Sequence, residues 1–283
     1  MRITGIGRAA GALLFALSLA APATAIAAGS PTHDVDVIAH RGSSAIAPEN
    51  TEAAVKVAIK QRADFVEIDV QRTKDGHLVN FHDCTMVRTT DVEERFPGRL
   101  SYRVSDFTWA EIRTLDAGSW FHESYAGEPI ISVRDLIRQI DGKIGLLAEI
   151  SPCGHYEGLA EDFAAELRSL PRYVDEALAD SQLAVQSFKV DDAKAFHAQL
   201  PDVPIGILNA NRPTDAELVA LSAWADQVNL QWTVTDEAMV TRIHQLGMET
   251  NAWTVNEAGP MRNLIKLGVD GIITDIPQSL TQR

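Results

Sequence analysis

Three carboxylates in this sequence stand where they could hold a metal ion. Glu67 and Asp69 lie two residues apart in an apolar run, and Glu149 ends a second apolar run. Residues i and i+2 of a strand point to the same face. Carboxylates that share an inward face repel each other unless a cation holds them, and three oxygen ligands suit Ca²⁺ or Mg²⁺. The alternative is that they face outward and pair with lysines in solvent.

Two histidines are expected at the same place. His40 ends the first apolar run, and a two-residue hairpin turn at Asp75-Gly76 places His82 opposite Asp69. One neutral and one protonated imidazole can act as base and acid near neutral pH. A lone histidine is more often structural, but two histidines beside three carboxylates favour catalysis.

Two further side chains could contact a substrate. Arg41 offers a planar cation that suits phosphate, although a surface salt bridge is the alternative. Trp253, near the end of a strand, could pack on the organic part of the substrate. Metal, arginine and paired histidines together indicate phosphoryl transfer with electrostatic stabilisation of the transition state.

The elements that must position these residues alternate between short apolar runs and helical patterns, which indicates a parallel sheet. The runs are 35–40, 65–70, 78–81, 145–150, 183–188, 205–209, 228–232, 250–255 and 271–274. Parallel strands need a crossover of about a dozen residues. The third run follows the second too closely for that, so Gln71–Asp83 is interpreted as an antiparallel hairpin.

Eight parallel strands remain, each followed by a helical pattern, which predicts an α/β fold of the (β/α)₈ TIM-barrel type. The helices are expected near 50–61, 132–140, 156–169, 191–199, 215–224, 236–246, 257–267 and from 277 onward. The hairpin follows the second strand. Residues of about 84–131 are expected to form an insertion at the C-terminal mouth of the barrel, where active sites of this fold lie.

The composition and the first residues of the chain indicate what the protein binds and where it acts. The chain has 283 residues and a formal charge of −14, which argues against nucleic-acid binding. Residues 1–28 are typical of a signal peptide, with Arg2 and Arg8 before an apolar run and small residues after it. An uncleaved anchor is the alternative, but Pro22 interrupts the run. We therefore expect a secreted protein without a stable membrane anchor, its barrel spanning residues 35–283.

Several short motifs resemble the glycerophosphodiester phosphodiesterase family. They are Ala39-His40-Arg41-Gly42, Pro48-Glu49-Asn50-Thr51, Val66-Glu67-Ile68-Asp69-Val70, Thr73-Lys74-Asp75-Gly76, Phe81-His82-Asp83, residues 115–121, residues 252–256 and residues 268–275. Each motif alone is weak, but the ordered set runs through nearly the whole chain after the leader. The resemblance implies a barrel enzyme that cleaves glycerophosphodiesters to glycerol 3-phosphate and an alcohol.

The resemblance also implies roles for individual residues. Glu67, Asp69 and Glu149 would be the ligands of Ca²⁺ or Mg²⁺. His40 and His82 would be the general acid and base, and Arg41 a phosphate contact. The family usually has a lysine two residues after the third carboxylate, where this chain has Ser151. Lys189 could replace that charge, unless it starts a helix and is solvated.

The two cysteines, Cys84 and Cys153, could form a disulfide or remain free thiols, and their spacing does not decide. Each cysteine follows closely a residue to which the resemblance assigns a role, Cys84 after His82 and Cys153 after Glu149. We therefore expect a disulfide at the barrel mouth.

The leading hypothesis is a secreted, metal-dependent phosphodiesterase acting on a small glycerophosphodiester. One alternative is a phospholipase D-like enzyme acting on lysophospholipid or sphingomyelin, which would need an apolar groove in the insertion. Another is a barrel that binds phosphodiesters without catalysis. The sequence leaves open the headgroup, the metal, the order in which the histidines act, and the oligomeric state.

Overall fold

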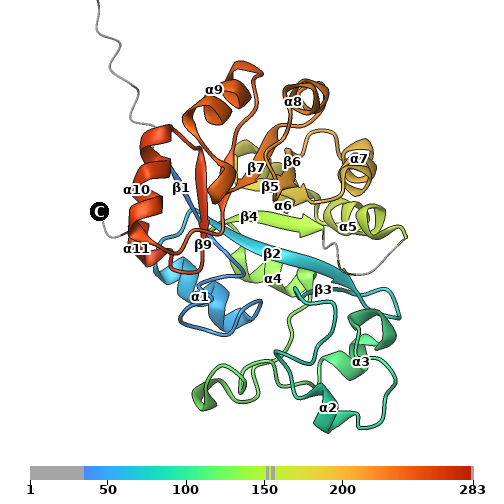
Figure 1. The fold of residues 1–283 in the computed structure, drawn as a ribbon. Helices are drawn as coiled ribbons and strands as arrows, with labels where there is room; N and C mark the ends of the chain where they lie inside the picture. Colours follow the sequence, from blue (N-terminus) through green and yellow to red (C-terminus); the bar gives the residue numbers. More distant parts are fainter. Residues whose placement is uncertain (1–34, 151–152, 154–156, 282–283) are drawn as a thin grey trace, which may run out of the picture. The chain divides into compact units, whose positions relative to one another are not determined.

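The computed structural model describes residues 35–150, 153 and 157–281, and in this part of the chain nine strands form one sheet (Figure 1). Eight of them are parallel and close into a barrel, because β1 (Asp36–Ala39) pairs with both β2 (Phe65–Arg72) and β9 (Gly271–Thr274). The other barrel strands are β4 (Gly145–Ile150), β5 (Leu183–Ser187), β6 (Ile205–Asn209), β7 (Gln227–Gln231) and β8 (Asn251–Trp253). The predicted TIM barrel is confirmed.

Helices cover the outside of the barrel (Figure 1). They are α1 (Glu52–Lys60), α4 (Val133–Ile140), α5 (Leu159–Arg168), α6 (Pro171–Ala179), α7 (Val190–Gln199), α8 (Asp215–Leu221), α9 (Glu237–Gln245), α10 (Ala258–Leu267) and α11 (Gln278–Thr281). Ser, Thr and Asp caps start several of them, as at Thr51, Ser132 and Asp236. Sequence analysis missed α6, whose signal is Pro171 in the first helical turn.

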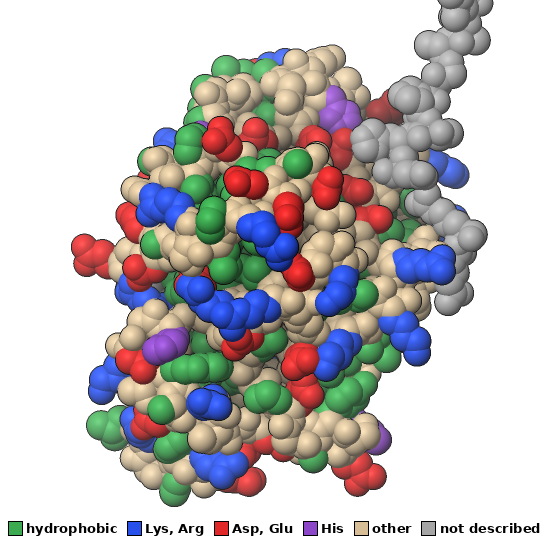
Figure 2. All heavy atoms as spheres, turned by 180° about the vertical axis from the view of Figure 1, so that it is seen from behind, with side chains coloured by type: hydrophobic (Ala, Val, Ile, Leu, Met, Phe, Trp, Pro, Cys, Tyr) green, Lys and Arg blue, Asp and Glu red, His purple; other side chains and the backbone are tan. Residues whose placement is uncertain are grey.

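The barrel strands are buried on both faces, as expected for a parallel sheet covered by helices. All six residues of β4 are buried. Outside the strands, the fully buried rings of Phe163 on α5 and Phe196 on α7 stack with centroids 5.6 Å apart. The face shown in Figure 2 mixes acidic, basic and hydrophobic side chains. Within the described residues, no helix combines the length and apolar character needed to cross a membrane.

The hairpin after β2 is present, but its register differs from the prediction by one residue. β3 (Leu78–Asn80) runs antiparallel to β2 and pairs Val70 with Asn80. The turn consists of Lys74, Asp75 and Gly76, closed by a hydrogen bond from the Thr73 N–H to the His77 carbonyl. Gly76 supplies the left-handed conformation (φ +86°) that a three-residue loop of this kind uses.

The predicted pairing of His82 with Asp69 is therefore wrong. The Phe81 N–H donates to the Asp69 carbonyl at 2.8 Å, so Phe81 stands opposite Asp69. The physical reason is the extra turn residue, which shifts every later pair by one position. β3 ends at Asn80, so His82 lies beyond the paired strand, and its side-chain direction is set by the loop that follows.

The insertion extends from the hairpin and carries α2 (Val92–Arg95), η1 (Val104–Asp106), α3 (Trp109–Ile112) and η2 (Glu123–Tyr125). In Figure 1, α2 and α3 lie together beyond β3. Its apolar cluster includes Phe107 and Ile112, and also Val79 and Phe81 from the hairpin. The insertion thus shares its core with the segment that leads to His82. Trp109 packs against this core, whereas Trp120 is 39% exposed.

The helical layer around Phe196 should contribute strongly to stability. We expect Phe196→Ala to lower the free energy of unfolding by about 3–5 kcal/mol, because the substitution leaves a cavity between α5 and α7. The fully exposed Leu100 (105%) provides the matched control, and Leu100→Ala should stay within about 0.5 kcal/mol of the parent. Denaturant unfolding of the two variants measures both values, and equal losses would contradict this account of the core.

Candidate active site

The three carboxylates meet at the C-terminal end of the barrel. Glu67 and Asp69 on β2 and Glu149 on β4 are buried, and each offers an oxygen within 4.8 Å of the others. The strand register sets Asp69 beside Glu149. Asp69 Oδ2 accepts a hydrogen bond from the Asn50 amide at 2.9 Å, whereas its buried Oδ1 has no hydrogen-bond partner among the described residues. An unpaired buried oxygen within such a cluster fits a bound divalent cation.

The pKa values of the two glutamates also fit a bound cation. Burial raises the pKa of Glu67 well above its usual value, and the charges of Asp69 and Glu149 raise it further. Burial also raises the pKa of Glu149, again with Asp69 adding to the effect. A cation would favour the charged forms of these groups and offset their repulsion. These residues could therefore hold Ca²⁺ or Mg²⁺, and their geometry fits the expected ligand set.

Arg41 sits against this cluster in a constrained loop. Its backbone N–H donates to Glu67 Oε2 at 2.9 Å, and its guanidinium donates to Glu49 at 2.8 Å. The residue has a φ of +56°, and Gly42 after it has a φ of +82°. A Cβ atom at position 42 would lie 2.6 Å from the Ala54 side chain, so the turn requires glycine. The left-handed loop aims Arg41 at the carboxylates.

Each histidine is held by an aspartate. His40 Nδ1 lies 2.6 Å from Asp275 Oδ1, and His82 Nδ1 lies 2.8 Å from Asp83 Oδ1. In both rings Nε2 remains the atom for exchange of a proton with a substrate. The side chains are 19% and 38% exposed, so both rings are accessible. Neither aspartate was among the predicted site residues, although Asp83 follows His82 directly.

Arg88 from the insertion supports the His82 side. Its Nε and Nη2 atoms donate to Asp83 at 2.6 and 2.9 Å, and its Nη1 and Nη2 atoms donate to Glu49 at 2.9 and 2.7 Å. Hydrogen bonds from Arg88 are the largest cause that lowers the pKa of Asp83 to about 2. Asp83 therefore stays ionised beside His82. Arg88 was not among the predicted site residues, because its role depends on joining the nearby Asp83 to Glu49, which lies 39 residues away.

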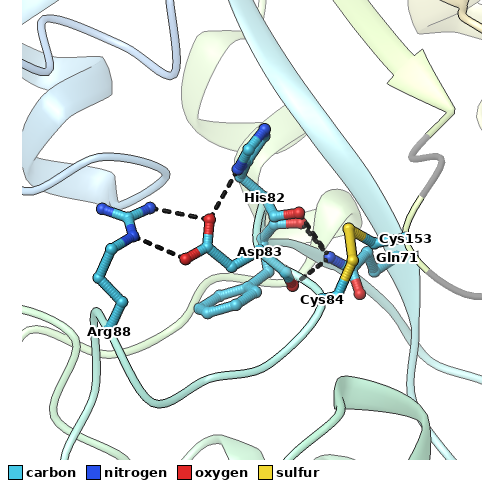
Figure 3. Close-up of a disulfide and its surroundings, with 7 residues drawn as sticks. Gln71, His82, Asp83, Cys84, Arg88 and Cys153 are labelled. Atoms are coloured by element: carbon cyan, nitrogen blue, oxygen red, sulfur yellow. Dashed lines mark hydrogen bonds and ion pairs between the residues drawn. A yellow bond between two sulfur atoms is a disulfide. The ribbon is translucent and has the colours of Figure 1, made fainter.

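The backbone around His82 is also fixed. The Gln71 amide lies within hydrogen-bond distance of the carbonyls of Phe81, His82 and Asp83, at 2.7, 3.0 and 2.9 Å (Figure 3). A disulfide joins Cys84 to Cys153, the pairing expected from the sequence, with Cα atoms 4.7 Å apart. The bond ties the end of the hairpin to the segment after β4. Figure 3 shows His82 between these restraints and Arg88.

Most of these residues line one small pocket. Its volume is about 140 Å³, and its lining includes His40, Arg41, Glu67, His82, Glu149, Gln186, Phe188 and Trp253. The Trp253 indole N–H donates to the Asn229 carbonyl at 2.9 Å, and its ring packs edge-on against Phe188. Trp253 therefore presents an apolar ring, which fits the expected contact with the organic part of a substrate.

The proposed replacement for the family lysine is not in this pocket. Lys189 is the N-cap residue of α7, and its Nζ atom lies 3.9 Å from Asp192. It does not line the pocket formed by the described residues. Ser151, the departure noted in the sequence, lies outside the described residues. The cation of this pocket within the described chain is therefore Arg41.

Metal binding should become stronger as the pH rises. Because the folded pKa values of Glu67 and Glu149 are raised, their contribution to the stability of the metal-free protein is present at low pH and is lost as the pH rises through those values. Ligation needs the deprotonated carboxylates. We expect the rise in Tm caused by Ca²⁺ or Mg²⁺ to be larger at about pH 8 than at about pH 6.

Thermal unfolding with and without each ion, across that pH range, measures this effect. Glu149→Gln should remove most of the metal-induced shift. The exposed Glu237 on α9 gives the matched control, and Glu237→Gln should leave the shift unchanged. A shift that is independent of pH, or that survives Glu149→Gln, would place the ion elsewhere.

The disulfide should affect both stability and rate. It closes a separation of 69 residues, and removing such a bond costs about 2–5 kcal/mol of stability. We expect the double variant Cys84→Ser, Cys153→Ser to unfold at a lower temperature. We also expect its kcat to fall more than its KM rises, because the segment carrying His82 loses a restraint. A reductant should reproduce both changes in the parent and add nothing in the double variant.

Comparisons with known proteins identify the family of this chain. The Glycerophosphoryl diester phosphodiesterase family matches residues 40–279. The chain is 35% identical to a glycerophosphodiester phosphodiesterase of Caldanaerobacter subterraneus, covering 86% of this chain and 95% of that protein. It is 30% identical to one from Bacillus subtilis, covering 85% and 83%. An Oleispira antarctica phosphodiesterase, solved with the product sn-glycerol-3-phosphate, matches with a TM-score of 0.73 and 31% identity over 87% of this chain and 94% of that one. The chain belongs to the glycerophosphoryl diester phosphodiesterase family.

Proposed function

We propose that this protein hydrolyses glycerophosphodiesters to glycerol 3-phosphate and an alcohol. The observation that carries the proposal is the meeting of three buried carboxylates, two aspartate-held histidines and Arg41 around one small pocket. The names of the relatives support the reaction, and the product bound to the Oleispira antarctica protein supports the substrate class.

Glu67, Asp69 and Glu149 would hold the divalent cation, Ca²⁺ or Mg²⁺. When bound, the ion neutralises charge on the phosphate oxygens and makes the phosphorus more electrophilic. Arg41 contributes a fixed positive charge beside the same cluster, since it is held by Glu49 and by its own backbone contact to Glu67. Charge stabilisation of this kind favours the transition state over the bound substrate.

His40 and His82 would carry the protons. In the first step the 2-hydroxyl of the glycerol moiety attacks phosphorus, and one imidazole takes its proton. The bond to the headgroup alcohol breaks, and the other imidazolium protonates the leaving oxygen. In the second step water opens the cyclic phosphate with the two proton transfers reversed. Asp275 and Asp83 orient the rings and stabilise their charged forms.

The pocket favours a small substrate. Its volume of about 140 Å³ lies below the ~300–1,000 Å³ of pockets that enclose drug-sized ligands. A glycerophosphodiester with a compact headgroup suits this space better than the acyl chain of a lysophospholipid or sphingomyelin. The presence of both histidines and all three carboxylates likewise favours catalysis over binding alone.

We also propose that the protein works in an oxidising compartment after secretion. The Cys84–Cys153 disulfide supports this setting, because such bonds persist mainly outside the reducing cytosol. The proposed signal peptide, residues 1–28, lies outside the described residues.

The purified protein should release glycerol 3-phosphate and choline from glycerophosphocholine. We expect a chelator to abolish release and Ca²⁺ or Mg²⁺ to restore it. His40→Ala and His82→Ala should each lower kcat by about 10²–10⁴-fold, the usual contribution of general acid–base catalysis. His197→Ala, on α7 away from the pocket, is the matched control and should retain activity.

Absence of turnover with either metal would contradict the proposal. Cleavage of lysophosphatidylcholine but not glycerophosphocholine would favour the phospholipase D-like alternative. Binding of glycerophosphocholine without turnover would favour the non-catalytic one.

A further inference from the structure

Gln186 is a pocket residue to which the mechanism above gives no part. It lies on β5, directly beside Glu149 in the strand register, and it is 1% exposed. Its side chain lines the pocket together with both histidines and Arg41. The question is whether its amide turns the oxygen or the nitrogen toward a ligand in the pocket.

A series of hydrogen-bonded side-chain amides inside the barrel, the amide chain, fixes the orientation of the Gln186 amide. The Asn251 backbone N–H donates to Asn229 Oδ1 at 3.0 Å. A backbone N–H can only donate, so Oδ1 is fixed as the acceptor and Nδ2 is the free donor. That Nδ2 atom donates to Gln186 Oε1 at 2.9 Å.

The hydrogen bonds at the Gln227 end of the amide chain require the same orientation of Asn229. Gln227 Nε2 donates to the Glu249 carboxylate at 3.1 Å. Gln227 Oε1 therefore faces inward, where it lies 3.4 Å from Asn229 Nδ2 and accepts from Asn251 Nδ2 at 3.2 Å. Both ends of the chain require Asn229 to present its NH₂ group, and so require Gln186 to receive it with its oxygen.

We infer that Gln186 binds substrate as a neutral N–H donor to a phosphate oxygen, with Asn229 as the positioning residue that sets this orientation. The inference rests on the proposed function, which it deepens. No described residue accepts a hydrogen bond from Gln186 Nε2, and an NH₂ group needs an acceptor when a ligand covers it. Because Oε1 accepts from Asn229, Nε2 is the polar atom that Gln186 has left for a ligand in the pocket.

The place beside Glu149 favours the phosphate over the organic part of the substrate. Glu149 is one of the residues that would hold the cation, and a cation held there would attract phosphate oxygens to the neighbourhood of Gln186. Arg41 lies on the side of β1, and Lys189 is turned to Asp192. Gln186 therefore supplies hydrogen-bond donation on the β5 side, where the described residues provide no cation.

The test compares Gln186→Met with the parent enzyme. Methionine keeps the volume and removes the donor. We expect KM for glycerophosphocholine, and the inhibition constants of glycerol 3-phosphate and inorganic phosphate, to rise about ten- to hundredfold, the usual effect of a hydrogen bond to a charged group. The metal concentration for half-maximal activity and the Tm should change little. Gln139→Met, which alters an amide on α4 outside the pocket, is the matched control.

A remote variant tests the orientation. In Asn229→Asp both side-chain oxygens accept, so Gln186 must turn its NH₂ group toward position 229 and its oxygen toward the pocket. We expect the same loss of phosphate affinity as in Gln186→Met. In the double variant, Asn229→Asp should add nothing to the effect of Gln186→Met.

Unchanged phosphate inhibition in Gln186→Met would overturn the inference, as would a weaker metal response with normal phosphate inhibition, since Gln186 would then act on Glu149. A change for glycerol 3-phosphate but not for inorganic phosphate would also overturn it, because the contact would be to the glycerol part. If the parent protein turns over no glycerophosphodiester, the proposed function fails, and calorimetric binding of phosphate to the parent and to Gln186→Met still tests the inference.

Discussion

The site depends on three carboxylates that are buried close together in the barrel, where negative charge is costly. Glu67, Asp69 and Glu149 are buried within a few ångströms of one another, and burial raises the pKa of both glutamates. Such a cluster is costly without a counter-charge. The fold offsets part of this cost by fixing Arg41 against the cluster, whereas one buried Asp69 oxygen has no hydrogen-bond partner among the described residues. Under the proposed function, this unfavourable arrangement would give the pocket its affinity for a divalent cation and, through it, for a phosphate.

The same cluster is also connected to His82. A continuous set of ion pairs and hydrogen bonds runs from Arg41 to Glu49, Arg88, Asp83 and His82. It joins the loop after β1 to the hairpin through an arginine supplied by the insertion. The insertion therefore does more than border the pocket, because its core includes the hairpin residues that precede His82. Rigid support of this kind is what proton transfer at a fixed distance requires.

Much of this arrangement was predictable because it follows from local rules. Carboxylates two residues apart on one strand, and strand ends that meet at one rim, brought Glu67, Asp69, Glu149 and His40 together. The predicted pairing of His82 with Asp69 was wrong because the turn that ends at Gly76 has one residue more than predicted. Sequence pattern alone does not fix the strand register at such a turn. Arg88, Asp275 and Asn229 have side-chain partners at distant positions, and single-sequence reasoning has no signal for such contacts.

The barrel interior shows a second way in which the fold prepares the site. Gln227, Asn229 and Asn251 place polar amides where a parallel barrel usually packs aliphatic side chains. Burying them is favourable only when they bond to one another in a consistent direction. Two fixed ends, a backbone N–H and the Glu249 carboxylate, select that direction and extend it to Gln186 at the pocket. The carboxylate cluster and the amide chain thus meet at neighbouring residues of β4 and β5, where under the proposed function one would hold the cation and the other would present an oriented donor to the same phosphate.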